Sequence, residues 1–149
     1  MRGVLAAALV SLMWACAQGA PQPSPLDTRN DACAVCRMTV SSARFASQLA
    51  APGEEPRFFD DLGCLAEHLR DRTRVPPRAV VFVADHRSGE WAAGASAVFT
   101  RVEGLETPMG SHVIAHTSAA SRDADPAARG GTPVDAAAFF GGPLPGGTR

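Results

Sequence analysis

The feature that most constrains the fold is a helix flanked by two strands between residues 57 and 85. The stretch "DDLGCLAEHLRDRTR", residues 60–74, predicts the helix because its apolar side chains recur at helical spacing. Asp60 or Asp61 can cap the N-terminus, and arginines fill the last turns before two prolines end the helix. A short strand is expected before it at 57–59, and the apolar run "AVVFVAD", residues 79–85, predicts a buried strand after it.

A further strand and a weak repeat of the pattern extend this unit into a fold. Residues 38–49, "MTVSSARFASQL", alternate imperfectly and predict a strand, which the Pro/Gly loop "APGEEP" would join to residues 57–59 as a hairpin. The second half predicts strands over 97–102 and 112–117, a short helix over 118–129 and an edge strand over 132–134. The sequence therefore predicts an α+β fold of two β-β-α-β modules, over about residues 31–85 and 86–140.

The N-terminus has the pattern of an export signal. Arg2 precedes the apolar run "VLAAALVSLMWA", which is too short for a transmembrane helix and ends at Cys16. This arrangement resembles a bacterial lipoprotein signal, in which the cysteine is lipidated and becomes the new N-terminus. We therefore expect residues 1–15 to be a signal peptide and the protein to be a membrane-anchored lipoprotein on the periplasmic side of the cell envelope. The alternative is a plain signal peptide, cut after an Ala-x-Ala-like site, and a secreted protein.

Two further segments have the composition of flexible chain. Residues 16–30, rich in Pro, Gln, Ala and Ser, are expected to form a lipid-anchored flexible tether. Residues 141–149, "GGPLPGGTR", are expected to be a disordered tail. One folded domain, residues 31–140, lies between these segments.

Charge and motifs exclude several functions. The chain has 14 arginines, no lysine and 15 acidic residues, and its arginines are scattered rather than clustered, which argues against nucleic-acid binding. No Ser-His-Asp pattern or Gly-rich phosphate loop is present. A Cys-x-x-Cys oxidoreductase needs its reactive thiol at a helix N-terminus, whereas here the pair precedes a predicted strand. We therefore expect that the protein is not an enzyme.

Cys33, Cys36 and Met38 are the strongest candidates for metal ligands. Thiolates and thioethers select cuprous copper, and a thioether is a poor ligand for zinc. If a strand begins near Cys36, then Cys36 and Met38 project to the same face, because side chains alternate along a strand. The alternative is that the two cysteines form a disulfide and Met38 is an ordinary core residue; the spacing alone does not separate these hypotheses.

Other residues are secondary candidates. Cys64 and His68, one helical turn apart, could join Cys33 and Cys36 in a Cys-Cys-Cys-His set, which would be a structural zinc site. Met109 lies in the loop "TPMGSH", where a thioether has no obvious core to fill, and His112 follows closely. The other two histidines, His86 and His116, are interpreted as ordinary surface or strand-end residues.

The motifs "DACAVCRM", "FFDDLGCL", "DHRSGEW" and "TPMGSHVIA", in that order after an export signal, resemble the NosL family, over roughly residues 31–134. These are copper-binding lipoproteins associated with assembly of nitrous-oxide reductase. The family usually has glycine where this chain has Arg37. The resemblance implies two β-β-α-β units, as in the non-catalytic part of organomercurial lyases, and one Cu(I) ion that is handed to a partner apoenzyme. Cys33, Cys36 and Met38 match the first motif, and Met109 matches the second methionine.

Two functions follow as expectations. The first is an extracytoplasmic copper chaperone that binds Cu(I) through Cys33, Cys36, Met38 and Met109 and delivers it to a copper enzyme, nitrous-oxide reductase or its assembly machinery. The second is a structural or interaction lipoprotein in which a disulfide or zinc ion staples the Cys-x-x-Cys pair.

Overall fold

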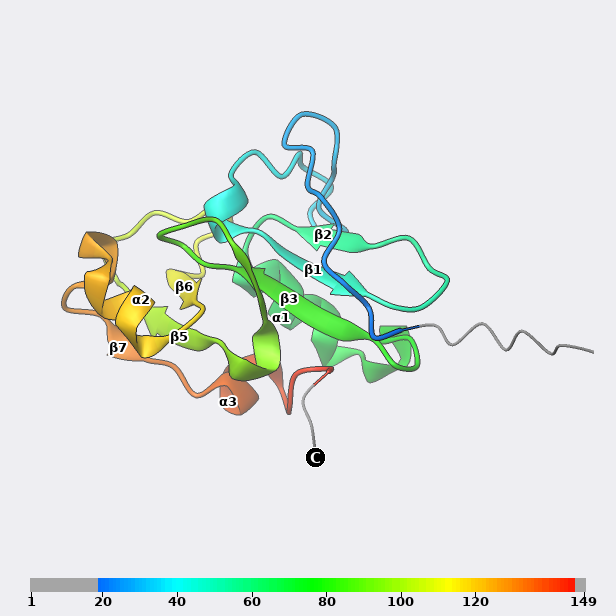
Figure 1. Ribbon diagram of the computed structural model, residues 1–149. Helices are drawn as coiled ribbons and strands as arrows, with labels where there is room; N and C mark the ends of the chain where they lie inside the picture. The colour runs from blue at the N-terminus through cyan, green and yellow to red at the C-terminus, as the bar shows by residue number, and fades with distance from the viewer. Residues whose placement is uncertain (1–18, 147–149) are drawn as a thin grey trace, which may run out of the picture.

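The computed structural model of the protein describes residues 19–146, so the signal peptide predicted over 1–15 and the lipidation predicted at Cys16 lie outside the described residues (Figure 1). The first module contains β1 (Ser47–Ala50), β2 (Arg57–Phe59), α1 (Leu62–Arg70) and β3 (Val80–Ala84). A further strand, β4 (Trp91–Ala93), completes an antiparallel sheet of order β2-β1-β3-β4. Within residues 19–146, no helix has the length and apolar character needed to cross a membrane.

The second module repeats the topology of the first. It contains β5 (Val98–Arg101), β6 (Val113–His116), α2 (Ala119–Ala124) and β7 (Thr132–Pro133), in an antiparallel sheet of order β6-β5-β7. In both sheets the first strand of the module lies between the second and the third. The prediction of an α+β fold with two β-β-α-β modules is therefore confirmed.

A single core joins the two modules. Helix α1 contacts β1 and β2 of its own module, β6 of the other module, and a C-terminal helix, α3 (Ala136–Phe140), that the sequence did not predict. Leu65 and Leu69 of α1 are fully buried, as the helical spacing of the apolar residues requires. Phe140 of α3 is buried against Phe99 of β5, with ring centroids 5.2 Å apart. The burial of α1 and α3 thus fixes how the modules meet.

The prediction of a strand over residues 38–49 is wrong for the first part of this range. Strand β1 begins only at Ser47, after a short 3-10 helix, η1 (Ala43–Phe45). Upstream, the chain forms a tight turn in which Ala32 pairs with Thr39, and this turn contains the Cys-x-x-Cys motif. The alternation of side chains along a strand therefore does not apply between Cys36 and Met38. Three more 3-10 helices connect other elements: η2 (Arg72–Arg74), η3 (Gly94–Ser96) and η4 (Pro126–Ala128).

Both segments that were expected to be flexible pack against the domain where the structure describes them. The buried side chain of Gln48 accepts a hydrogen bond from the Ser24 backbone N–H at 2.8 Å and donates one to the Ser24 carbonyl at 3.0 Å. At the other end, Leu144 is buried, and the Val81 N–H donates to the Pro145 carbonyl at 3.1 Å. Residues 24–30 and 141–146 therefore belong to the folded unit.

Candidate metal centre

The turn around Cys33 and Cys36 is closed by its own backbone. The Cys33 N–H donates to the Met38 carbonyl at 2.8 Å, and the Arg37 N–H donates to the Cys33 carbonyl at 3.1 Å. Arg37 adopts a left-handed conformation with φ 67°. Glycine takes this conformation without strain, whereas other residues do so at a cost. The arginine keeps the same turn.

The junction between β2 and α1 supplies the other half of the centre. Asp60 follows the last residue of β2, and Cys64 lies in the first turn of α1. Asp61 caps the helix, since its carboxylate accepts a hydrogen bond from the Gly63 N–H at 2.6 Å. Because Asp61 performs the capping, the neighbouring Asp60 is free to turn its buried carboxylate toward the thiols.

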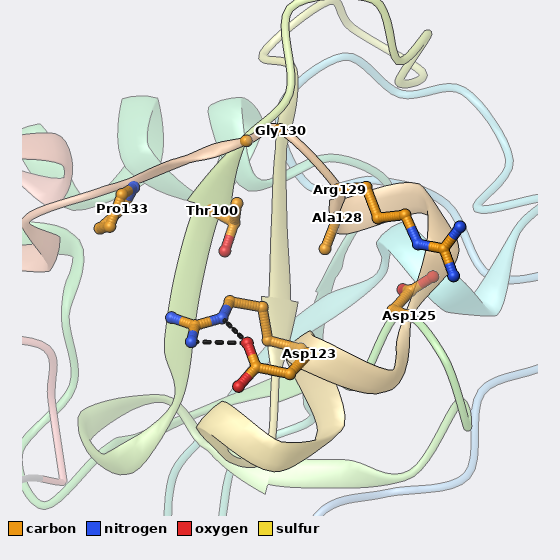
Figure 2. Close-up of a pocket in the computed structure, with 9 residues that line it drawn as sticks. Thr100, Asp123, Asp125, Ala128, Arg129, Gly130 and Pro133 are labelled. Atoms are coloured by element: carbon orange, nitrogen blue, oxygen red, sulfur yellow. Dashed lines mark hydrogen bonds and ion pairs between the residues drawn. The ribbon is translucent and has the colours of Figure 1, made fainter.

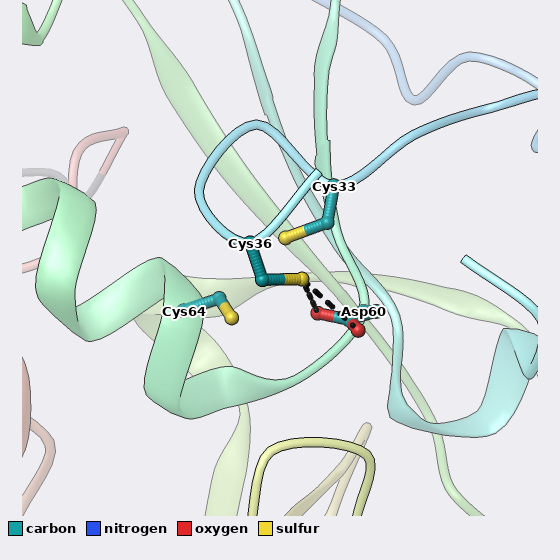
Figure 3. A group of neighbouring side chains, drawn as sticks. All are labelled: Cys33, Cys36, Asp60 and Cys64. Atoms are coloured by element: carbon teal, nitrogen blue, oxygen red, sulfur yellow. Dashed lines mark hydrogen bonds between the residues drawn. The ribbon is translucent and has the colours of Figure 1, made fainter. Parts of the chain in front are cut away.

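Four side chains converge at this place (Figure 3). The sulfurs of Cys33, Cys36 and Cys64 and a carboxylate oxygen of Asp60 all lie within 4.8 Å of one another. The Cys36 Sγ lies 3.5 Å from each Asp60 oxygen. Within residues 19–146 the three cysteines are free thiols, so Cys33 and Cys36 do not form a disulfide in this structure. The cluster provides soft sulfur donors with one harder oxygen donor beside them.

The surroundings of Cys36 and Cys64 favour the protonated form of these two thiols. Burial raises the pKa of Cys36, and the proximity of Cys33 and Asp60 raises it further. Burial, the Cys33 thiol and the Asp60 carboxyl also raise the pKa of Cys64 strongly. A metal ion bound as a thiolate complex would therefore displace protons from the cluster. Its positive charge would replace them as the partner of the thiolates.

A cavity of about 450 Å³ opens from the cluster to the surface. Its lining includes Cys36, Cys64 and Met109. Met109 is 48 % exposed, and its backbone N–H donates to the Asp61 carboxylate at 2.9 Å. Gly63 lets this loop approach the helix, because a Cβ at residue 63 would lie 3.1 Å from the Cβ of Ser111. The structure thus brings one of the two predicted methionines to the mouth of the thiol cluster.

The remaining predicted ligands lie elsewhere. Met38 is 49 % exposed and does not line this cavity. His68 is buried against Phe59 and faces Arg57 and Arg74, which add to the effect of burial in lowering its pKa. His112 Nδ1 lies 2.8 Å from the Leu105 carbonyl and so braces the loop. Neither histidine belongs to the cluster, and Asp60 takes the fourth place that the Cys-Cys-Cys-His hypothesis gave to His68.

Sequence reasoning missed the role of Asp60 and the meaning of two histidines. One helix needs only one capping residue, so the pair Asp60-Asp61 left one carboxylate without an assigned partner. His86 and His116, interpreted as ordinary residues, are buried and lie with Asp125 in a second group of potential metal ligands.

Comparison of the chain with protein families, with curated proteins and with solved structures found no match.

Proposed function

We propose that this protein is an extracytoplasmic copper chaperone of the NosL type that binds Cu(I) and passes it to a copper enzyme. The observation that supports this best is the convergence of three thiols beside an exposed thioether at the mouth of one cavity. Thiolates and thioethers are the ligands that select Cu(I) over harder ions. The pKa values of Cys36 and Cys64 are raised, whereas a nucleophilic thiol is favoured by a lowered pKa.

The cluster has a buried and an accessible side, which suits uptake and release. Cys33 and Cys64 are buried, whereas Cys36 is half-buried and Met109 is exposed. In transfer, a ligand of the partner forms a bond to Cu(I) as the bond to Met109 or Cys36 breaks. The copper stays Cu(I) throughout, and each released thiolate takes up a proton. The buried thiols hold the ion until the last exchange.

The setting of this activity rests on the sequence. The export signal and Cys16 support a lipoprotein anchored to the membrane on the periplasmic side, and the resemblance to the NosL family supports nitrous-oxide reductase or its assembly machinery as recipient. The same resemblance also implies Met38 as a ligand, but Met38 does not line the cavity, and the proposed ligand set does not include it. Nucleic acid is not among the proposed partners.

A Cu(I) titration of the reduced protein tests the proposal. Under anaerobic conditions, with a chromophoric Cu(I) chelator in competition, we expect about one tightly held ion per chain. Cys36→Ser should weaken the affinity by more than about 10-fold, because even loss of an outer partner of a metal ligand costs about 10–100-fold. Cys16→Ser is the control for loss of a cysteine, since Cys16 is proposed to be lipidated rather than to bind copper, and the Cu(I) affinity of this variant should equal that of the wild type. Failure to compete with the chelator at all would refute the proposal.

One observation favours a second candidate, a structural zinc site. Asp60 adds an oxygen donor to the three thiols, and three cysteines with one harder ligand form a closed tetrahedral zinc set. In that case purified protein would contain stoichiometric zinc that copper does not displace, and its removal by a chelator would unfold the chain.

A further inference from the structure

A second group of ligands lies at the junction of the two modules, apart from the cysteines. His86 follows β3 by two residues, His116 is the last residue of β6, and Asp125 lies between α2 and η4. The backbone N–H of His86 donates to the Ala115 carbonyl at 2.9 Å, which fixes the end of β3 against β6. Three separate segments of the chain therefore bring two imidazoles and a carboxylate to one buried point.

The two imidazoles converge on a single oxygen atom. His86 Nδ1 lies 2.6 Å from Asp125 Oδ2, and His116 Nε2 lies 3.0 Å from the same oxygen. All three residues are buried, with exposed fractions of 5 %, 0 % and 5 %. The other oxygen of Asp125 accepts a hydrogen bond from the Ala127 N–H at 2.9 Å, which fixes the orientation of the carboxylate.

The two distances to Asp125 Oδ2 are close to those between neighbouring ligand atoms in a metal coordination shell, and all three ligand atoms lie within 4.8 Å of one another. Bonds of about 2.0–2.1 Å in a tetrahedral zinc site place neighbouring ligand atoms about 3.3 Å apart. The two observed distances are 0.3 to 0.7 Å shorter than this, so small side-chain movements would admit an ion in place of the two ring protons. His116 Nδ1 is buried without a hydrogen-bond partner among the described residues. The ring proton of His116 can therefore sit on Nδ1, which leaves the Nε2 lone pair for a metal, without breaking another hydrogen bond.

A cavity adjoins one of the three residues, Asp125. Asp125 and Thr100 line a cavity of about 400 Å³ beside the group (Figure 2). The Thr100 hydroxyl is buried and has no partner within the described part of the chain. Three protein ligands with an adjoining cavity is the arrangement of a metal site that keeps one position open to water or an added ligand.

We propose that His86, His116 and Asp125 bind a borderline divalent transition-metal ion, of which Zn²⁺ is the representative. Imidazole and carboxylate ligands suit such ions, whereas the thiols of the other cluster suit Cu(I). The protein thus carries two metal sites of different softness. This inference does not depend on the copper-chaperone proposal, because the two sites share no residue.

Zinc titration of the reduced full chain, followed by NMR of the imidazole nitrogens, tests this directly. The sequence has four histidines, so their side-chain nitrogens can be assigned individually. On addition of Zn²⁺ alone, we expect His86 Nδ1 and His116 Nε2 to shift as metal-bound nitrogens while the signals of His68 and His112 stay in place. Zinc at the thiol cluster would leave all four imidazoles unligated, so the measurement separates the two sites.

Variants supply the second readout. Asp125→Asn and His86→Gln should each weaken zinc binding at this site by more than about 100-fold, because loss of a ligand exceeds the 10–100-fold cost of losing an outer partner. His68→Gln is the matched control, being another buried histidine, and should bind as the wild type does. Unshifted His86 and His116 signals in the wild type would overturn the proposal, whether or not the variants fold. The proposal would also be overturned if the Asp125→Asn and His86→Gln variants fold and their zinc affinity at this site, read from the His116 signal, equals that of the control.

Discussion

The carboxylate of Asp61 ties Met109 to the start of the helix that carries Cys64. One oxygen accepts from the Gly63 N–H at 2.6 Å as the helix cap, and the other accepts from the Met109 N–H at 2.9 Å. Although burial would raise the pKa of Asp61, hydrogen bonds from Ser111, Thr107 and these amides lower it, so the group is ionised. The two modules are thus linked at the candidate copper site by one buried side chain.

Replacing this carboxylate should separate the thioether from the thiols. Asp61→Asn offers one oxygen in place of two, and we expect a loss of about 1–3 kcal/mol in the free energy of unfolding and a weaker Cu(I) affinity. The effect on affinity should be absent in a Met109→Leu background, which a double-mutant cycle measures. Asp135→Asn is the control, because Asp135 caps α3 away from the cluster and should affect stability alone. Equal losses of affinity in both backgrounds would contradict the link.

The two exposed methionines form a matched pair. Met109 and Met38 have nearly the same exposed fraction, 48 % and 49 %, but only Met109 lines the cavity with Cys36 and Cys64. Met109→Leu should weaken Cu(I) binding at least about 10-fold, through loss of a ligand, while Met38→Leu leaves the affinity unchanged. Chelator competition under identical conditions gives both values. If both variants weakened binding, the ligand set that the resemblance implies, which contains both methionines, would be favoured over the one that the cavity indicates.

Asp60 should distinguish copper from zinc. Its carboxylate is a hard donor, so Asp60→Asn is expected to lower zinc affinity at least about 10-fold. Cu(I) affinity should not fall, since removal of the negative charge that helps to raise the pKa of Cys36 and Cys64 makes their deprotonation easier. Parallel titrations of wild type and variant with Zn²⁺ and with Cu(I) measure the change in each affinity. A parallel loss for both ions would show that Asp60 supports the thiols rather than selecting the metal.

Arg37 should be replaceable with a gain in stability. Its left-handed conformation costs about 1–2 kcal/mol. Glycine avoids this cost, but the unfolded chain gains conformational entropy with glycine, which offsets part of the gain in stability. Arg37→Gly is therefore expected to raise the free energy of unfolding by about 0.5–1 kcal/mol, as measured by urea denaturation. Arg44→Gly is the control, because Arg44 lies in η1 without a positive φ and should lose stability. A destabilised Arg37→Gly would indicate that the arginine side chain makes a compensating contact.

The sequence predicts the order of elements well because that order depends on local patterns. The apolar stripe of α1, its capping aspartate Asp61 and the apolar run of β3 each lie within a few residues, and all three appear in the structure. The missed elements are short: β4 has three residues and α3 has five, too few to show a period.

The sites are less predictable because their geometry comes from contacts between residues that are far apart in the sequence. The sequence placed Cys36 and Met38 on one strand face, but the left-handed Arg37 turns the chain between them. His86 and Asp125 are 39 residues apart, and nothing in either local sequence indicates that they meet. The thiol pair and Met109, by contrast, stand out in their local motifs, and the structure places Cys36 and Met109 on the same cavity.

Asp85 provides a test of stability against pH. This buried carboxylate accepts hydrogen bonds from the N–H groups of Arg87 and Ser88 at 3.0 Å through one oxygen, and from the N–H and hydroxyl of Thr117 at 2.8 and 2.9 Å through the other. It thereby joins the end of β3 to the residue after β6. Burial raises the pKa, but hydrogen bonds from Ser121, Thr117 and Ser88 outweigh it and hold the pKa of Asp85 well below its usual value.

Because the folded state lowers this pKa, the carboxylate stabilises the fold above its unfolded value of 3.8 and loses that contribution as the pH falls through the folded value. In Asp85→Asn, one pair of donors faces the NH₂ group of the amide, which cannot accept their hydrogen bonds. This should lower the free energy of unfolding by about 1–3 kcal/mol at neutral pH. The free energy of unfolding of wild type and variant is measured by urea denaturation of metal-free protein. The difference between the two values should be constant from pH 7 to pH 5 and shrink below about pH 4. A difference that stays constant down to pH 2 would mean that packing, rather than the charge of Asp85, joins the two modules at this point.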